Sequence, residues 1–357
     1  MTTTSSRRRA AARLLTVPAA ALLLAACGAD TEPSTGTAAG SEAASSDEPL
    51  VIYSGRNENL VGGLLDQLEE AVGTPVEVRY GDSAELAAQL LEEGDATEAD
   101  LFFSQDAGAL GALGREGRLA ELEDGVADVV DERFRDEDGR WVAVSARARV
   151  LAYDPAQVPE IDEIDEVDDL LDPRYRGKIG FAPTNASFQA FVTALRVQEG
   201  EDGAGEWLTA FAANEPVAME KNGVVLDAVD SGEVSLGLIN HYYWFEKVAE
   251  LGADQVSAKI HYLDNDDPGA LINVAGAGVV EGSEQSEAAG RALEFLLSDT
   301  AQEYFADETA EYPVVEGVTS TEHDLVPLDE LEGASVDLND LDSLEETLVL
   351  LDEVGLT

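Results

Sequence analysis

The residues best suited to chemistry lie together at the end of one apolar segment. Residues 235–245 read SLGLINHYYWF, so that Tyr242 and Tyr243 are adjacent. Two phenolates aimed at one point make a hard, oxygen-rich site for a small, highly charged cation. Because neighbouring residues of a strand point to opposite faces, both hydroxyls can meet only where the strand bends into a helix. The alternative interpretation is an aromatic core with hydroxyls at its wet edge, and these residues alone leave both open.

His241 precedes the tyrosines, but alternation along the strand turns its side chain away from Tyr242, which makes it a weaker metal candidate. The histidines of the chain fall in no zinc-binding spacing. The sequence contains no G-x-S-x-G elbow, no P-loop and no dinucleotide fingerprint. Acidic pairs occur throughout, so no general acid–base dyad stands out. Nothing in these residues therefore calls for an enzyme, although they do not exclude one.

Polar residues at a predicted helix start form a second candidate site. Residues 179–182 are a predicted strand, and the following segment 183–187, which contains Asn185, Ala186 and Ser187, opens a helix that runs to about residue 199. Free backbone amides with nearby hydroxyl and amide side chains suit an anion. The alternative is an ordinary helix cap.

A strand-like apolar run over residues 141–153 carries Arg147 and Arg149. Long strands of this kind often join two lobes of a protein, and both guanidinium groups would then lie near a hinge. The alternative is a pair of solvent-facing arginines on an edge strand. The sequence leaves both interpretations open.

The elements that position these groups form an α/β fold. The predicted order after the N-terminal region is strand 50–54, helix 60–72, strand 76–80, helix 84–93 and strand 100–104. That order predicts a parallel sheet with right-handed crossovers. Ligands of such sheets bind beyond the carboxyl ends of the strands, where residues 54–57 and 104–106 lie.

A second α/β unit follows the first. Its predicted elements are helix 204–214, strand 217–219, helix 223–231 and the stretch that leads to the tyrosines. Residues 270–276 are extended and are predicted to cross back to the first lobe. Helices 286–297 and 300–306 then follow, and a tail helix over 342–354 closes the chain.

Residues 1–27 are predicted to be a lipoprotein signal peptide. Four arginines precede an apolar run from Leu14 to Ala26 that is too short to span a bilayer, and the run ends in a lipobox-like Leu-Ala-Ala-Cys. Cys27, the single cysteine of the chain, is the predicted lipidation site. The sequence does not distinguish the general export route from the twin-arginine route. Residues 28–49 are rich in Gly, Ser, Thr and Ala and are predicted to be a flexible tether.

The chain is strongly acidic. It carries a formal net charge of −53, and loss of the four signal-peptide arginines would leave 17 basic against 74 acidic residues, or −57. Such a charge argues against nucleic acid and anionic membrane surfaces as partners. We interpret the acids as a solvated surface, suited to high salt, where screening weakens their repulsion.

Ordered sequence blocks give the chain a wider resemblance. They are VIYSGRNE (51–58), ADLFFSQDAGAL (99–110), SARARV (145–150), IGFAPTNASF (179–188), KNGVVLDAV (221–229), LINHYYW (238–244), DPGAL (267–271) and AEYP (310–313). With these blocks, essentially the whole of residues 50–355 resembles the ferric-iron-binding solute receptors of bacterial ATP-binding-cassette importers. The resemblance implies an α/β clamshell of type 2 periplasmic-binding topology, in which each of two lobes is a mixed sheet flanked by helices.

The resemblance also implies a division of the chain between the lobes. We expect lobe 1 to comprise residues 50–147 and about 273–322. Lobe 2 is then expected to comprise residues 148–272 and about 323–357. The ligand would bind between them.

The same resemblance implies that Tyr242 and Tyr243 bind Fe³⁺. Ferric ion prefers anionic oxygen, and its coordination drives the ionisation of a phenol whose free pKa is near 10. The anion-binding positions of the family fall on Asn185, Ala186, Ser187, Asn222 and Asn240. A synergistic carbonate or phosphate there would fill coordination positions that the protein leaves open.

Two positions depart from the pattern of the family. Asn57 stands where some members have a metal-binding His, and Gln105 stands where they have a ligand Glu. Neutral amides are poor substitutes at Fe³⁺, so Asn57 and Gln105 are only possible ligands, and Asp106 is another. We expect Arg56 and Arg147 to hold a carbonate or phosphate that bridges to the iron.

The implied protein is an extracytoplasmic monomer, attached to the membrane by its lipid and delivering iron to a permease with its ATPase subunits. One alternative is the same fold tuned to a polyamine, thiamine or an iron chelate. Polyamine sites, however, need carboxylates flanked by aromatics. A second alternative is a secreted hydrolase, for which the sequence shows no nucleophile and base.

Overall fold

A computed structural model describes residues 48–357, which fall in one compact unit. The predicted signal peptide, Cys27 and nearly all of the predicted tether lie outside the described residues. Within residues 48–357, no helix is long and apolar enough to cross a membrane.

The described residues form a mixed sheet in the strand order β2-β1-β3-β9-β4-β7-β5-β6, with β8 paired to β4. The strands are β1 (Leu50–Ser54), β2 (Val76–Tyr80), β3 (Leu101–Ser104), β4 (Val142–Tyr153), β5 (Ile179–Phe181), β6 (Val217–Ala218), β7 (Leu236–Asn240), β8 (Lys259–His261) and β9 (Ile272–Val279). Strands β1, β2 and β3 are parallel, as predicted from their order in the sequence. The short strand β8 was not predicted.

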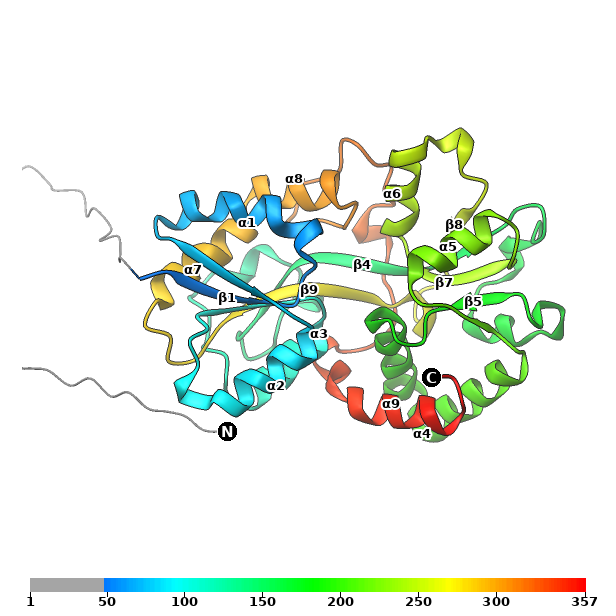
Figure 1. Cartoon of the computed structure of the whole chain (residues 1–357), viewed down its shortest axis with the longest axis horizontal. Coiled ribbons are helices and arrows are strands. Elements are labelled where there is room, and N and C mark those ends of the chain that lie inside the picture. Colours follow the sequence, from blue (N-terminus) through cyan, green and yellow to red (C-terminus); the bar gives the residue numbers. More distant parts are fainter. Residues whose placement is uncertain (1–47) are drawn as a thin grey trace, which may run out of the picture. The chain divides into compact units, whose positions relative to one another are not determined.

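Helices cover the sheet (Figure 1). They are α1 (Glu58–Val72), α2 (Ser83–Glu93), α3 (Ala107–Arg115), α4 (Ala186–Ala213), α5 (Asn222–Asp230), α6 (Tyr242–Leu251), α7 (Ser286–Leu296), α8 (Asp299–Glu308) and α9 (Leu344–Glu353). Two separately predicted helices form α4, which is interrupted at Gly200, where φ is 76°. The strand-to-helix bend at the tyrosines is confirmed, because β7 ends at Asn240 and α6 begins at Tyr242.

Strands β4 and β9 are the antiparallel pair on which the whole sheet is built. Figure 1 shows them side by side, with β1 and α1 toward one end and β5 and α5 toward the other. The first half of β4 pairs with β9, and the second half, from Arg149 onward, pairs with β7. Both Arg147 and Arg149 are buried beside this change of partner, each about 3% exposed. The alternative of solvent-facing arginines on an edge strand is therefore wrong.

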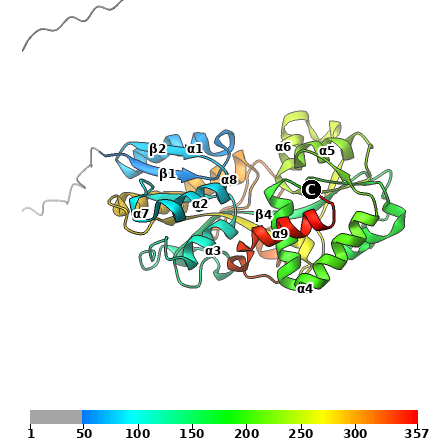
Figure 2. The same ribbon diagram turned by 60° about the horizontal axis from the view of Figure 1, so that its bottom comes forward.

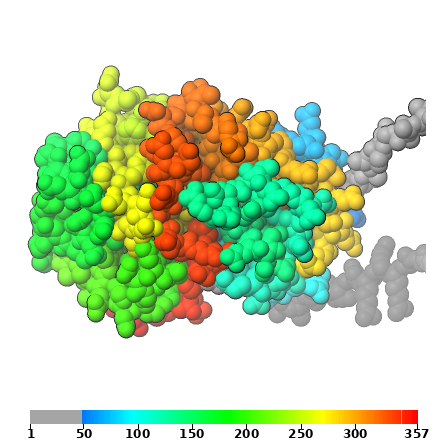
Figure 3. Space-filling model, turned by 180° about the vertical axis from the view of Figure 1, so that it is seen from behind, coloured from blue at the N-terminus to red at the C-terminus, as the bar shows by residue number. Residues whose placement is uncertain are grey.

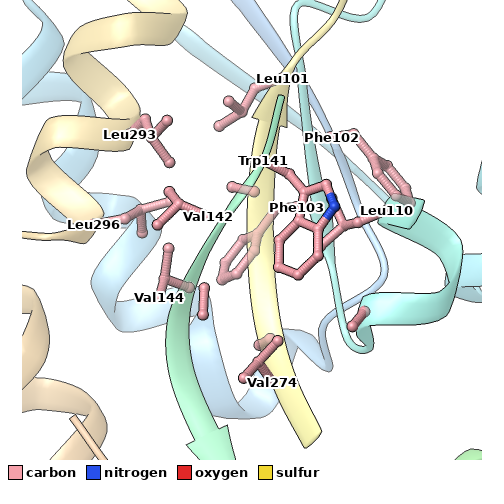
Figure 4. Packing of buried hydrophobic residues seen from close by; sticks show 14 of the residues in the cluster. Leu101, Phe102, Phe103, Leu110, Trp141, Val142, Val144, Val274, Leu293 and Leu296 are labelled. Carbon is pink, nitrogen blue, oxygen red and sulfur yellow. The ribbon is translucent and has the colours of Figure 1, made fainter. Parts of the chain in front are cut away.

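The buried apolar residues fall into separate clusters along the sheet. The largest contains β1, β3, β9, the first half of β4 and the inner faces of α1, α3 and α7. In Figure 4, Leu293 and Leu296 of α7 lie on one side of this sheet and Leu110 of α3 on the other. A second cluster packs α4 on β5 and β7, and Phe181 of β5 lies 5.1 Å from the ring of Phe188 and 5.5 Å from that of Phe211 in α4. The α/β prediction is confirmed.

The C-terminal segment contacts both clusters. The 3-10 helix η10 (Leu338–Asp342) packs on α3, where Trp141 Nε1 donates to Asn339 Oδ1 at 3.1 Å. The following helix α9 packs on α4, where Arg196 donates to Thr347 Oγ1 at 2.9 Å. Figure 2 shows α9 beside α4, and Figure 3 shows the orange and red C-terminal segments between the yellow-green and teal surfaces. The lobe boundaries given above stay a prediction.

The close packing of η10 on α3 depends on glycine. A Cβ added to Gly108 would lie 2.4 Å from the backbone oxygen of Leu341. We predict that Gly108→Ala lowers the free energy of unfolding by roughly 1–3 kcal/mol, measured by urea denaturation, because backbone must shift to admit the methyl group.

The matched control for this substitution is Gly290→Ala on α7, where an added Cβ has no heavy atom within 4 Å. Alanine favours the helix, so this variant is expected to be as stable as the wild type or more stable by up to about 1 kcal/mol. Equal losses in both variants would contradict the packing described for η10.

Candidate functional site

A cavity of about 510 Å³ lies where strand β4 changes its pairing from β9 to β7. It is bounded by the ends of strands and the starts of helices, the arrangement expected for ligand sites in α/β sheets. The lining residues are Gly55, Arg56, Asn57, Glu58, Leu60, Tyr80, Gly81, Gln105, Asp106, Arg147, Arg149, Asn185, Ala186, Ser187, Asn240, Tyr242, Tyr243, Leu271 and Asn273. The structure thus brings together the residues predicted for the site, apart from Asn222, which lies directly behind Asn185 and Ser187.

The paired tyrosines open helix α6 at the cavity. Their rings stack with centroids 4.3 Å apart and an interplanar angle of 27°. Burial raises the pKa of Tyr242 well above its ordinary value, and the neighbouring phenol of Tyr243 raises it further. The charge of Arg147 acts in the opposite direction. Tyr242 is therefore a neutral phenol at physiological pH unless a cation enters the cavity and displaces its proton.

A buried ion cluster stands behind one wall of the cavity. Arg56 meets Glu311 in a bidentate pair, with Nη2–Oε2 at 2.6 Å and Nη1–Oε1 at 3.1 Å. Arg147 Nη1 lies 3.8 Å from Glu311 Oε1, and its Nη2 donates to the backbone oxygen of Gln105. Burial opposes the ionisation of Glu311, but the charges of Arg56 and Arg147 outweigh it and lower its pKa. One carboxylate thus serves two guanidinium groups.

Arg149 has no such partner among residues 48–357. Its Nη1 donates to Ser187 Oγ at 3.1 Å, while the buried Nη2 has no hydrogen-bond partner. Burial lowers the pKa of Arg149 to about 10, an effect that the nearby Tyr243 and Tyr242 oppose. A buried, uncompensated guanidinium beside two phenols favours the binding of a negatively charged group.

The start of α4 completes this positive region. Asn185 caps the helix by accepting from Ser187 N at 3.0 Å, and its Oδ1 also accepts from Ser187 Oγ at 2.6 Å. Asn222 Nδ2 donates to Ser187 Oγ at 2.9 Å, whereas its own Oδ1 is buried without a partner. Asn240 ends β7 directly opposite Arg149. The backbone amides of a helix start and the side chain of Arg149 therefore face the same cavity.

The possible additional metal ligands are already hydrogen-bonded. Asn57 caps α1, with Oδ1 accepting from Asn59 N at 2.9 Å, and Gln105 Oε1 accepts from Arg56 at 2.9 Å. Asp106 caps α3 through one oxygen, which accepts from Ala109 N at 3.1 Å, and burial raises its pKa. Their part in binding a metal stays a prediction.

His241 lies outside the lining of the cavity. Its Nδ1 accepts from Ala148 N at 3.2 Å, and its ring stacks on Tyr312 at 4.4 Å. Burial lowers its pKa to about 4. Within residues 48–357, no group of three or more His, Cys, Asp or Glu is placed to hold a metal ion.

Two residues at or behind the cavity, Arg149 and Glu311, were not among the predicted metal-binding and anion-binding residues. Arg149 could have been added, because residues two apart on a strand share a face and Arg147 was already a candidate. Glu311 lies in the block AEYP that contributes to the resemblance, but nothing in that block marks it as the partner of Arg56, 255 positions away.

Comparisons with known proteins agree with this arrangement. A family model described as bacterial extracellular solute-binding protein matches residues 96–347. The chain is 33% identical over 320 residues to the Fe(3+)-binding periplasmic protein of Serratia marcescens, covering 89% of this chain and 94% of that protein. It is 31% identical over 315 residues to the major ferric iron-binding protein of Neisseria meningitidis, covering 86% and 93%.

The chain is also similar to a solved structure of an iron-bound protein. Iron-bound HitA from Pseudomonas aeruginosa superposes with a TM-score of 0.79 at 33% identity, covering 86% of this chain and 99% of that one. The fold and the cavity define a solute-binding protein of type 2 periplasmic-binding topology, which confirms the predicted fold class. More narrowly, the chain belongs to the ferric-iron-binding family of these proteins.

The unpaired charge of Arg149 generates a stability prediction. Methionine preserves the apolar stem of arginine and removes the buried charge. We predict that Arg149→Met raises the free energy of unfolding of the ligand-free protein by roughly 1–3 kcal/mol, measured by urea denaturation.

Arg196→Met is the matched control. Arg196 is equally buried but fully engaged by Glu201, Ser343 and Thr347. Its loss leaves buried acceptors without donors, so stability should fall by about 1–3 kcal/mol. A loss of stability in both variants would show that Arg149 is compensated in the folded protein.

Proposed function

We propose that this protein binds Fe³⁺ through Tyr242 and Tyr243 and delivers it to the permease of an ATP-binding-cassette importer. The observation that carries the proposal is the stacked phenol pair at a cavity that also holds a buried, uncompensated guanidinium beside the phenols. The relatives are named as ferric iron-binding proteins, which supports the same cargo here.

Phenol chemistry explains how such a site would choose its ion. Fe³⁺ is hard and highly charged and favours anionic oxygen. Because the pKa of Tyr242 is raised in the empty cavity, metal binding must displace its proton, and the proton competes with the ion. Affinity is therefore expected to fall as the pH falls. A weaker Lewis acid displaces that proton less readily.

We propose that carbonate or phosphate binds with the iron. The start of α4 lines the cavity with Asn185, Ala186 and Ser187, and Arg149 offers charge and a free Nη2. An anion there would face the phenols and complete the coordination of the metal. Arg56 and Arg147 also line the cavity, but Glu311 already balances much of their charge.

The cavity does not favour a polyamine, one of the other ligands considered from sequence. A polyamine needs carboxylates, whereas the charged groups that line this cavity include three arginines. We propose that the protein is not an enzyme, since the site holds no nucleophile with a base beside it. A lipid on Cys27, extracytoplasmic location, a monomeric state and docking to a permease with its ATPase subunits complete the proposal.

The cargo is tested by colour. We predict that ferric citrate added to the purified full-length protein produces a visible phenolate-to-iron charge-transfer band. The band should disappear in the double variant Tyr242→Phe/Tyr243→Phe, because phenylalanine keeps the ring and removes the ligand oxygen. Tyr153→Phe, a half-buried tyrosine of β4 outside the cavity lining, should keep the full band. A colourless wild type would exclude the proposed cargo.

The anion is tested through Arg149. We predict that added carbonate or phosphate strengthens iron binding by the wild type, measured by competition with citrate. Arg149→Met should weaken binding by about tenfold, the equivalent of one charge-assisted hydrogen bond, and should lose most of the anion dependence. Arg196→Met should retain both properties. Equal anion dependence in wild type and Arg149→Met would place the anion elsewhere.

A further inference from the structure

Three guanidinium groups reach the cavity, but only two of them have a carboxylate partner within residues 48–357. Arg56, Arg147 and Arg149 all line it. Glu311 does not line the cavity, and its side chain is about 1% exposed. It pairs with Arg56 and Arg147 from behind the wall and leaves Arg149 without a carboxylate. The positive charge available to a ligand therefore depends on a residue that the ligand does not touch.

The carboxylate of Glu311 is held firmly in place. Its Oε2 also accepts from Ser145 Oγ at 3.0 Å and from Thr309 Oγ1 at 3.3 Å. The backbone on either side is fixed, because Glu311 N donates to Phe305 O at 2.9 Å and Tyr312 exchanges two 2.9 Å hydrogen bonds with Ala146 of β4. Glu311 is thus anchored to the strand that carries Arg147 and Arg149.

We propose that Glu311 is a specificity-determining residue of the cavity, which lowers its affinity for anions by offsetting one of the two positive charges of Arg56 and Arg147 and so favours Arg149, which has no carboxylate partner in the described part of the chain, as the group that holds the anion. The proposal rests on the proposed function, in which an anion binds with the metal. It adds the residue that sets how strongly, and at which guanidinium, that anion is held.

The charges involved give the reason for such a residue. Fe³⁺ bound by two phenolates retains one positive charge. Three arginines without Glu311 would raise the positive charge of the cavity far enough to bind anions tightly in the absence of metal. With Glu311 in place, the three arginines and this carboxylate carry a net charge of +2 instead of +3. An anion would then bind strongly only together with the iron, and it would not block the empty cavity.

The competing explanation is that Arg56 itself contacts the anion and that Glu311 only orients it. The two explanations differ in what happens when both members of the pair are removed. Charge compensation predicts that the two losses cancel. Direct contact predicts that anion binding stays weak whenever Arg56 is absent.

The test is a titration of iron-free, full-length protein with inorganic phosphate, followed by calorimetry and by the phosphate-induced shift in melting temperature. Glu311→Gln keeps the shape of the side chain and removes its charge. We expect this variant to bind phosphate about tenfold more tightly than the wild type, and Arg56→Gln to bind it more weakly.

The double variant Arg56→Gln/Glu311→Gln decides between the explanations. Phosphate affinity within about twofold of the wild type supports charge compensation, and affinity as low as that of Arg56→Gln overturns it. Removing both partners leaves fewer unpaired buried charges than Glu311→Gln alone, so this variant decides the matter even if the single variant fails to fold.

Asp100→Asn is the matched control. Asp100 is a buried carboxylate that accepts from Val51 N and Ser283 Oγ and does not line the cavity. Its phosphate affinity should equal that of the wild type, and an increase like that of Glu311→Gln would contradict a local role for Glu311. Because no iron is present, the titration stands apart from the colour test of the cargo.

Discussion

A buried guanidinium must find negative charge, and the site of this protein is arranged around that constraint. Three arginines meet where β4 changes its partner from β9 to β7. Two of them share Glu311, while Arg149 has one hydroxyl and no carboxylate among the described residues. The cost of burying Arg149 is a source of binding energy, because a ligand that supplies the missing negative charge recovers it.

The interior of the cavity and the surface of the chain have opposite charge. The sequence carries a net charge of −53, whereas the charged groups at the back of the cavity are dominated by arginine. The acidic surface attracts cations over about a Debye length and repels free anions. Inside, the phenols must lose protons to hold a metal, and the guanidinium groups favour that loss. The acidic surface therefore favours a cation, and the guanidinium groups inside the cavity favour an anion.

Much of this site follows from the sequence because its residues stand at the ends of periodic elements. The periodicity of the apolar strands predicts where each strand ends, and those carboxyl ends carry Arg56, Gln105 and Tyr242 toward one edge of the sheet. The metal interpretation required a bend at Tyr242, and the structure has one. The family resemblance then supplied roles that spacing alone could not assign.

What the sequence could not supply was pairing between distant residues. Glu311 meets Arg56 from 255 positions away, and the block AEYP that contains it does not indicate this pairing. Asn57 and Gln105 are possible metal ligands by residue position, whereas their side-chain oxygens cap a helix and accept from Arg56. Hydrogen bonds of this kind depend on the final packing, and periodicity carries no information about them.

The position of β9 has a consequence for the order in which the protein folds. This strand lies between β3 and β4, although more than a hundred residues separate it from either in the chain. The first apolar core therefore lacks its central strand until residue 279 is available, and α9 completes the second core later still. Contacts so distant in sequence form slowly, since a long loop must close before each is made. Synthesis must thus pass β9 before the first core can form and α9 before the second is whole, and the Arg56–Glu311 pair should be among the later contacts to form.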